Sequence, residues 1–163
     1  MKRLILIGIS ILLLLIDNTI LPYYNIKGAF PSLLFVFAIA YSIVNGKKEA
    51  IFIGILSGFL QDIFFFYGAG INIFLNFLLC LLAAIIGDNI FKENRIIPTL
   101  SCLFISILKV LGVVLIFKVI SLSVNIETAL LSAVFNSIWM IIVYKIVLTT
   151  SDKYMIREVW RFK

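Results

Sequence analysis

Six long apolar segments, separated by short polar gaps, account for most of this chain. They span residues 4–21, 30–45, 50–67, 70–87, 98–120 and 127–149. Hydrophobic residues make up 63% of the sequence and charged residues only 13%, whereas a soluble domain is about half apolar and about a quarter charged. Lipid must therefore surround most of the chain. The sequence predicts an all-α integral membrane protein, a six-transmembrane-helix bundle that forms a single domain over residues 1–163.

The predicted helices differ in length. A helix needs about 20 residues to cross about 30 Å of hydrocarbon, and the first, fifth and sixth segments reach that length. The second is short, and a tight Gly68-Ala69-Gly70 turn joins the third to the fourth. We expect these middle helices to be tilted, short or buried in protein. The N-terminus imitates a signal peptide, but no small-residue cleavage site follows it, so we expect a retained first helix.

Basic residues indicate the orientation of the predicted bundle. With the N-terminus in the cytoplasm, the inner side holds Lys2, Arg3, Lys47, Lys48, Lys92, Arg95, Lys153, Arg157, Arg161 and Lys163. The outer side holds only Lys27 and Lys118. Cytoplasmic loops carry an excess of Lys and Arg, so both termini are predicted to be cytoplasmic. The same placement explains the net charge of +6 as an orientation signal and not as a nucleic-acid-binding surface.

Composition also excludes several kinds of catalytic and metal site. The chain has no His, which removes Ser-His-Asp triads, Cys-His dyads and His-ligated metals. Cys80 and Cys102 lie in apolar runs and are interpreted as small packing residues. Lys109 with a neighbouring serine could form a Ser-Lys dyad, but no oxyanion-hole or nucleophile-elbow pattern accompanies it. We expect no enzyme activity, no metal and no cofactor.

Small and polar residues share one face of the third and fourth segments, as in close helix contacts within membranes. These faces hold Gly54, Ser57, Gly58, Gln61 and Asp62, and then Asn72, Asn76, Cys80, Ala83 and Gly87. Narrower faces in the last two segments hold Ser101, Lys109 and Gly112, and then Thr128, Ser132, Asn136 and Trp139. Ordinary bundle packing, with interhelical hydrogen bonds, explains these faces; a substrate pocket is the alternative.

Lys109 is the least expected residue, because it lies near the middle of segment 98–120. At about 1.5 Å per residue, Lys109, Asp62 and Asp17 lie about 16 to 20 Å from the inner ends of their helices. An unpaired ammonium at that depth is strongly disfavoured. We therefore predict an ion pair between Lys109 and Asp62 or Asp17. The alternatives are that Lys109 snorkels to the surface or meets a partner subunit.

The C-terminal tail, residues 151–163, is predicted to be a short basic amphipathic helix. Lys153, Arg157 and Arg161 form one stripe at helical spacing, and Trp160 belongs to the opposite, apolar side. Such a helix lies on the inner leaflet of a membrane. It is either an ordinary basic flank of the last helix or a docking site for a cytoplasmic partner.

Four motifs lie in fixed order between residues 30 and 90. They are Pro31-Ser-Leu-Leu-Phe, Asn45-Gly46-Lys-Lys-Glu49, Gly54-x3-Gly58-x2-Gln61-Asp62-Ile and Gly70-Ile-Asn72. Together they resemble the MreD family of rod shape-determining membrane proteins. The resemblance carries over Pro31, Gly58, Gln61, Asp62, Gly70 and Asn72 as family positions. With Gly54 and Asn76 on the same faces, these are the predicted interaction or structural residues.

The resemblance implies a non-enzymatic subunit of the bacterial cell-elongation complex, which makes peptidoglycan, in the plasma membrane. Its implied partners are an MreC-like protein and, near it, MreB, RodA and a class B penicillin-binding protein. The family also looks like the S components of energy-coupling-factor vitamin transporters, which are six-helix bundles. A small-molecule-binding S component is therefore the alternative function. That function needs an outward-open polar cavity, and the predicted outer loops 22–29, 68–70 and 121–126 offer only Lys27 as a basic group.

Overall fold

The computed structural model describes the backbone of residues 2–64, 70–90, 96–119 and 125–159, and the side chains of 3–63, 70–90, 96–119 and 125–151. Six α-helices make up nearly all of this part of the chain. They are α1 (Lys2–Thr19), α2 (Leu33–Asn45), α3 (Lys47–Phe64), α4 (Ile71–Asp88), α5 (Ile96–Val119) and α6 (Ile126–Val159). A short 3-10 helix, η1 (Leu21–Tyr24), follows α1. Each predicted segment overlaps one of the α-helices, which confirms the all-α class for the described residues.

Most helix boundaries differ from the prediction by one to three residues, and the differences at α2, α5 and α6 are the most informative. α2 begins at Leu33 because Pro31 favours an extended residue before it and Ser32 caps the helix. α5 begins at Ile96, with Pro98 in its first turn, where no backbone N–H is needed for the helix ladder. α6 continues without a break to Val159. The predicted tail helix is thus the end of α6, whereas Trp160, Arg161 and the side chains of Lys153 and Arg157 lie outside the described residues, as does the predicted turn at 68–69.

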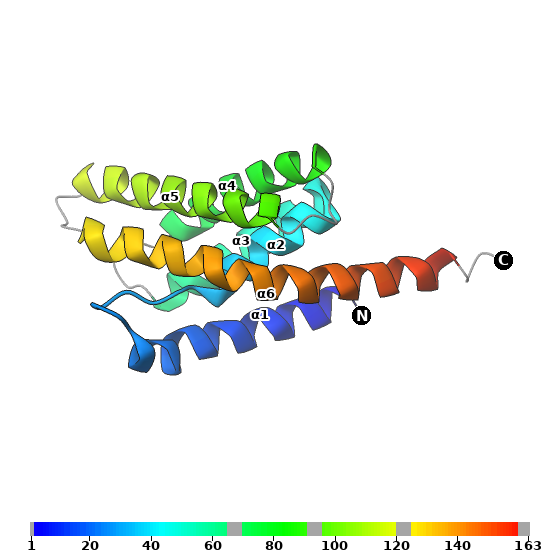
Figure 1. Cartoon of the computed structure of the whole chain (residues 1–163), viewed down its shortest axis with the longest axis horizontal. Helices are drawn as coiled ribbons and strands as arrows, with labels where there is room; N and C mark the ends of the chain where they lie inside the picture. Colours follow the sequence, from blue (N-terminus) through cyan, green and yellow to red (C-terminus); the bar gives the residue numbers. More distant parts are fainter. Residues whose placement is uncertain (1, 65–69, 91–95, 120–124, 160–163) are drawn as a thin grey trace.

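The helices run alternately in opposite directions (Figure 1). α2, α4 and α6 begin at one end of the bundle, on the left of Figure 1, and we call this the distal end. α1, α3 and α5 begin at the other end, where α6 also ends, and we call this the proximal end. Between α1 and α2 the chain turns tightly at Lys27 and Gly28, whose positive φ angles of 54° and 78° belong to a two-residue turn between Ile26 and Ala29.

α2 is the central helix of the bundle. It contacts α1, α3, α4, α5 and α6, and its residues from Leu33 to Val44 are buried except for the partly exposed Phe37. A helix that is apolar on every side is stable when neighbours cover every side, which explains its uninterrupted hydrophobic sequence. The expectation that a middle helix is buried in protein is therefore confirmed for α2.

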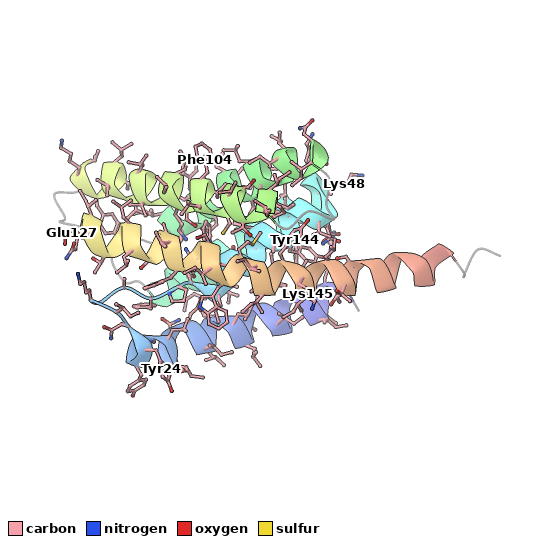
Figure 2. The ribbon with its side chains drawn as sticks, in the orientation of Figure 1. Tyr24, Lys48, Phe104, Glu127, Tyr144 and Lys145 are labelled. Atoms are coloured by element: carbon pink, nitrogen blue, oxygen red, sulfur yellow. The ribbon has the colours of Figure 1, made fainter. Side chains whose placement is uncertain are left out.

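The outward surface of the bundle is largely apolar. Large hydrophobic side chains are exposed along the outer helices, including Leu12 of α1, Phe104 and Leu115 of α5, and Ile142 of α6. Phe104 lies on the outside in Figure 2, whereas Tyr144 is fully buried. Within the described residues, three helical stretches are by length and composition apolar enough to cross a membrane: Ile71–Asp88, Ile96–Val119 and Ile126–Ser151. An apolar exterior on such helices is what a lipid environment favours.

The predicted glycine face of α3 packs directly against α4. A Cβ atom on Gly54 would lie 2.9 Å from the backbone oxygen of Asn76, and one on Gly58 would lie 2.5 Å from that of Asn72. These neighbours are backbone atoms, so they cannot move aside as a flexible side chain can. Both glycines are therefore required for the close approach of the two helices, which is the role of small residues in membrane bundles.

Candidate functional site

The carboxylate of Asp17, near the end of α1, lies at the beginning of α2. Its oxygens accept hydrogen bonds from the backbone N–H groups of Leu33 (2.8 Å) and Leu34 (3.0 Å) and from the Ser32 hydroxyl (3.1 Å). These N–H groups have no partner within the helix, and the positive end of the helix dipole favours a negative charge there. Asp17 therefore fixes α1 to the start of the central helix.

Asp62, near the end of α3, holds the start of α4 in the same way. It accepts hydrogen bonds from the backbone N–H groups of Gly70 (3.0 Å), Asn72 (3.1 Å) and Ile73 (3.0 Å), and from the side-chain amide of Asn72 (3.0 Å). Gly70 has a φ of 97°, which glycine adopts without steric cost. The structure thus brings together three residues that the sequence singled out: Asp62, Gly70 and Asn72.

Ser32 and Asn136 complete the start of α2. The Ser32 N–H donates to Asn136 Oδ1 (2.8 Å), and Ser32 Oγ accepts from the Phe35 N–H (3.4 Å). Every backbone N–H from Ser32 to Phe35 therefore has a side-chain acceptor, supplied by α1, by α6 or by Ser32 itself. The sequence analysis did not single out Ser32. Its signal was a serine between a proline and an apolar run, which is typical of a helix N-cap.

Gln61 joins the start of α2 to the interior of the bundle. Its Nε2 donates to Ser32 Oγ (3.0 Å), and its Oε1 accepts from Asn76 Nδ2 (3.0 Å) and from Lys109 Nζ (2.9 Å). Asn76 also donates to Ser57 Oγ (3.2 Å). We call Asp17, Ser32, Ser57, Gln61, Asn76 and Lys109 the polar cluster. It connects α1, α2, α3, α4 and α5. The predicted faces of α3 and α4 do meet, and interhelical hydrogen bonds join them.

The direct ion pair predicted for Lys109 is replaced by a different contact. Lys109 Nζ donates to Gln61 Oε1 and lies 4.2 Å from the centroid of the Phe35 ring, a cation–π contact. Among the described side chains, no carboxylate oxygen lies within 4.0 Å of it. Asp17 and Asp62 attract it at longer range, but both are held by backbone N–H groups at helix starts. Among the described residues a direct ion pair is not seen, whereas the shared layer and a longer-range pairing of Lys109 with Asp17 or Asp62 stay predictions.

A polar pocket of about 450 Å³ lies over the polar cluster, toward the distal end. Side chains from all six helices, and from the residues just before α2 and α6, line this pocket. Residues of α6 form one of its walls. Its polar lining consists of Asp17, Asn18, Ser32, Gln61, Asn72, Ser106, Lys109, Asn125, Thr128, Ser132 and Asn136. A smaller hollow of about 230 Å³ between α1, α2 and α6 has an almost wholly apolar lining. We take the polar pocket as the candidate site because, of these two hollows, it is the one in which directional polar groups converge.

Other predicted residues take structural places around this pocket. Pro31 is buried directly before Ser32. Trp139 does not line the pocket with Thr128, Ser132 and Asn136, and it is 37% exposed. The Ser106 hydroxyl accepts from Asn136 Nδ2 (3.4 Å), whereas Lys109 donates to Gln61, so no Ser-Lys hydrogen bond forms between these two described residues.

The family comparison covers the part of the chain that holds the polar cluster and the pocket. A family model described as rod shape-determining protein MreD matches residues 2–150. No curated protein and no solved structure gives a significant match to the chain. The matched region contains the whole polar cluster and every residue of the pocket, together with all but the last residue, Ser151, of the three long apolar helical stretches. The chain belongs to the MreD family of rod shape-determining membrane proteins.

Proposed function

We propose that this chain is a non-enzymatic membrane subunit of the bacterial cell-elongation complex that binds an MreC-like partner through the distal pocket. In this proposal all six helices cross the plasma membrane and both chain termini lie in the cytoplasm. The pocket then opens toward the outside of the cell. RodA, a class B penicillin-binding protein and MreB are neighbours in the larger complex that makes peptidoglycan. Family membership is the starting point of the proposal.

The distribution of charge supports this orientation. Among the described side chains, the proximal half holds the basic residues Arg3, Lys47, Lys48 and Lys145, whereas Lys27 and Lys118 lie toward the distal end and Lys109 lies near the middle of α5. Figure 2 labels Lys48 and Lys145 in the proximal half. An excess of Lys and Arg marks the cytoplasmic side of a membrane protein. The distal end, where the pocket lies, is therefore assigned to the outside.

The observation that carries the proposal is the polar pocket within a bundle whose exterior is apolar. Its open surface is mostly apolar, from residues such as Phe30, Phe35 and Val113, with polar groups of Gln61, Lys109 and Asn136 among them, so a segment that carries both apolar and polar side chains fits it. The described connection between α1 and α2 at the distal end contains η1 and a tight turn, and it exposes Tyr23, Tyr24 and Lys27. A segment of the partner just outside its membrane anchor can reach the pocket at this end.

Filling the pocket is expected to release the partner without unfolding the bundle. Ala129 lines the pocket on α6, and Ala129→Trp places a large ring in it. Val134 on the same helix is 45% exposed on the outward surface, so Val134→Trp is the matched control. We expect the MreC-like partner to co-purify in mild detergent with wild type and Val134→Trp, and to be reduced about tenfold or more with Ala129→Trp. Equal retention by both variants would contradict the proposal.

The pocket also gives the small-molecule alternative a specific basis. A cavity of about 450 Å³ lined by convergent polar side chains is within the range of ligand-binding sites. The two functions separate in a thermal-shift screen of vitamins on the purified protein, run beside the co-purification. A ligand-dependent rise in melting temperature, with no partner retained, would favour a transporter S component over a complex subunit.

A further inference from the structure

Lys109 faces the pocket with part of its hydrogen-bonding capacity unused by the described residues. An ammonium group has three N–H donors. One donates to Gln61 Oε1 at 2.9 Å, and the Phe35 ring lies 4.2 Å away. The side chain is partly exposed, and it lines the pocket together with Ser106, Ser132 and Asn136. The remaining donors thus have the pocket as their nearest open volume.

The two acidic residues closest in depth to Lys109 are already engaged. Asp17 accepts three hydrogen bonds at the start of α2, and Asp62 accepts four at the start of α4. Each carboxylate also balances the positive end of a helix dipole. Moving either one to Lys109 would leave backbone N–H groups without acceptors in the interior, which is costly. The charge of Lys109 is therefore best matched by an anion from outside the chain.

We infer that the pocket is an anion-recognition site, and that Lys109 binds a carboxylate of an acidic side chain carried by the partner's segment just outside the membrane. This inference rests on the proposed function and deepens it. A carboxylate accepting from an ammonium makes a charge-assisted hydrogen bond, which is strong where water is scarce. The neighbouring Ser106, Ser132 and Asn136 offer hydroxyl and amide groups for a second carboxylate oxygen.

The test is a binding measurement in nanodiscs of neutral phosphatidylcholine, with the purified MreC-like partner. The absence of anionic lipid leaves the partner as the only source of the carboxylate. We expect Lys109→Met to weaken partner binding about thirtyfold or more, and Lys109→Arg to keep most of the affinity. Thermal unfolding of each variant checks that the bundle remains folded, since Met fills similar volume without a buried charge.

A second arm identifies the acidic group. Each Asp and Glu in the partner's membrane-proximal outer segment is changed to Asn or Gln and tested against wild type and Lys109→Met. One of these partner variants should bind the wild-type chain more weakly than the unchanged partner does. The same variant should bind Lys109→Met no more weakly than the unchanged partner does. Equal binding by wild type and folded Lys109→Met overturns the inference while leaving the proposed function intact. If wild type itself does not bind the partner, the proposed function fails, and the inference with it.

Discussion

Asp62→Ala is expected to lower the free energy of unfolding by about 3 kcal/mol or more. The substitution removes the acceptor of the Gly70, Asn72 and Ile73 N–H groups, which start α4. Each buried N–H left without an acceptor costs about 1–3 kcal/mol, and the favourable interaction with the helix dipole is lost as well. Thermal unfolding followed by circular dichroism in mild detergent measures the effect.

Asp88 provides the matched control for this substitution. It also lies at the end of a helix, but its ion pair with Lys47 (3.3 Å) is well exposed at the proximal end. Exposed ion pairs contribute about 0–1 kcal/mol, so Asp88→Ala should unfold close to wild type. Similar stability of the two alanine variants would show that Asp62 does not hold α4 in the way described here.

Gln61→Leu is expected to produce the second large loss, about 2–4 kcal/mol. Leucine removes the acceptor of Lys109 Nζ and of Asn76 Nδ2, and the donor to Ser32 Oγ. The main cost comes from Lys109, because a cation in the interior is left with only the Phe35 ring and distant carboxylates.

The double variant Gln61→Leu/Lys109→Met tests that explanation. Removing the cation as well should recover part of the lost stability, with a coupling energy of about 1 kcal/mol or more between the two sites. The same unfolding measurement on wild type, both single variants and the double variant gives this energy. Strictly additive losses would mean that Gln61 stabilises the bundle without serving Lys109.

Hydropathy and residue spacing were sufficient to predict the helices and their contact faces. The apolar runs fixed six helical segments, and Gly54 and Gly58 on one side of α3 indicated close packing that the structure confirms against α4. These features depend on local periodicity, which a single sequence displays directly. The shortness of the second segment suggested a tilted, short or buried helix, and the structure shows that α2 is both short and buried.

The partners of the ionisable groups were not predictable in the same way. The rise per residue placed Asp17, Asp62 and Lys109 at similar depths, but depth does not reveal which groups compete for a carboxylate. Asp17 comes 16 residues before Leu33 in the sequence, and its carboxylate reaches the start of α2 across the connection that contains η1. The N–H groups at the starts of α2 and α4 point toward the two carboxylates and lie close to them. Both carboxylates therefore accept hydrogen bonds from these groups and not from Lys109. Gln61, a neutral acceptor, therefore binds the cation.

The central claim is that lipid surrounds this bundle and that its distal end, with the pocket, faces the outside of the cell. Tyr24 is 78% exposed at the distal end and Lys48 is exposed at the proximal end (Figure 2), while the native Cys80 and Cys102 are buried. Labelling of single-site variants with a membrane-impermeant maleimide tests the claim most directly. We predict that Tyr24→Cys reacts in intact cells with any outer membrane permeabilised, and that Lys48→Cys reacts only after the plasma membrane is opened. Reaction of Lys48→Cys in intact cells, with Tyr24→Cys protected, would contradict it.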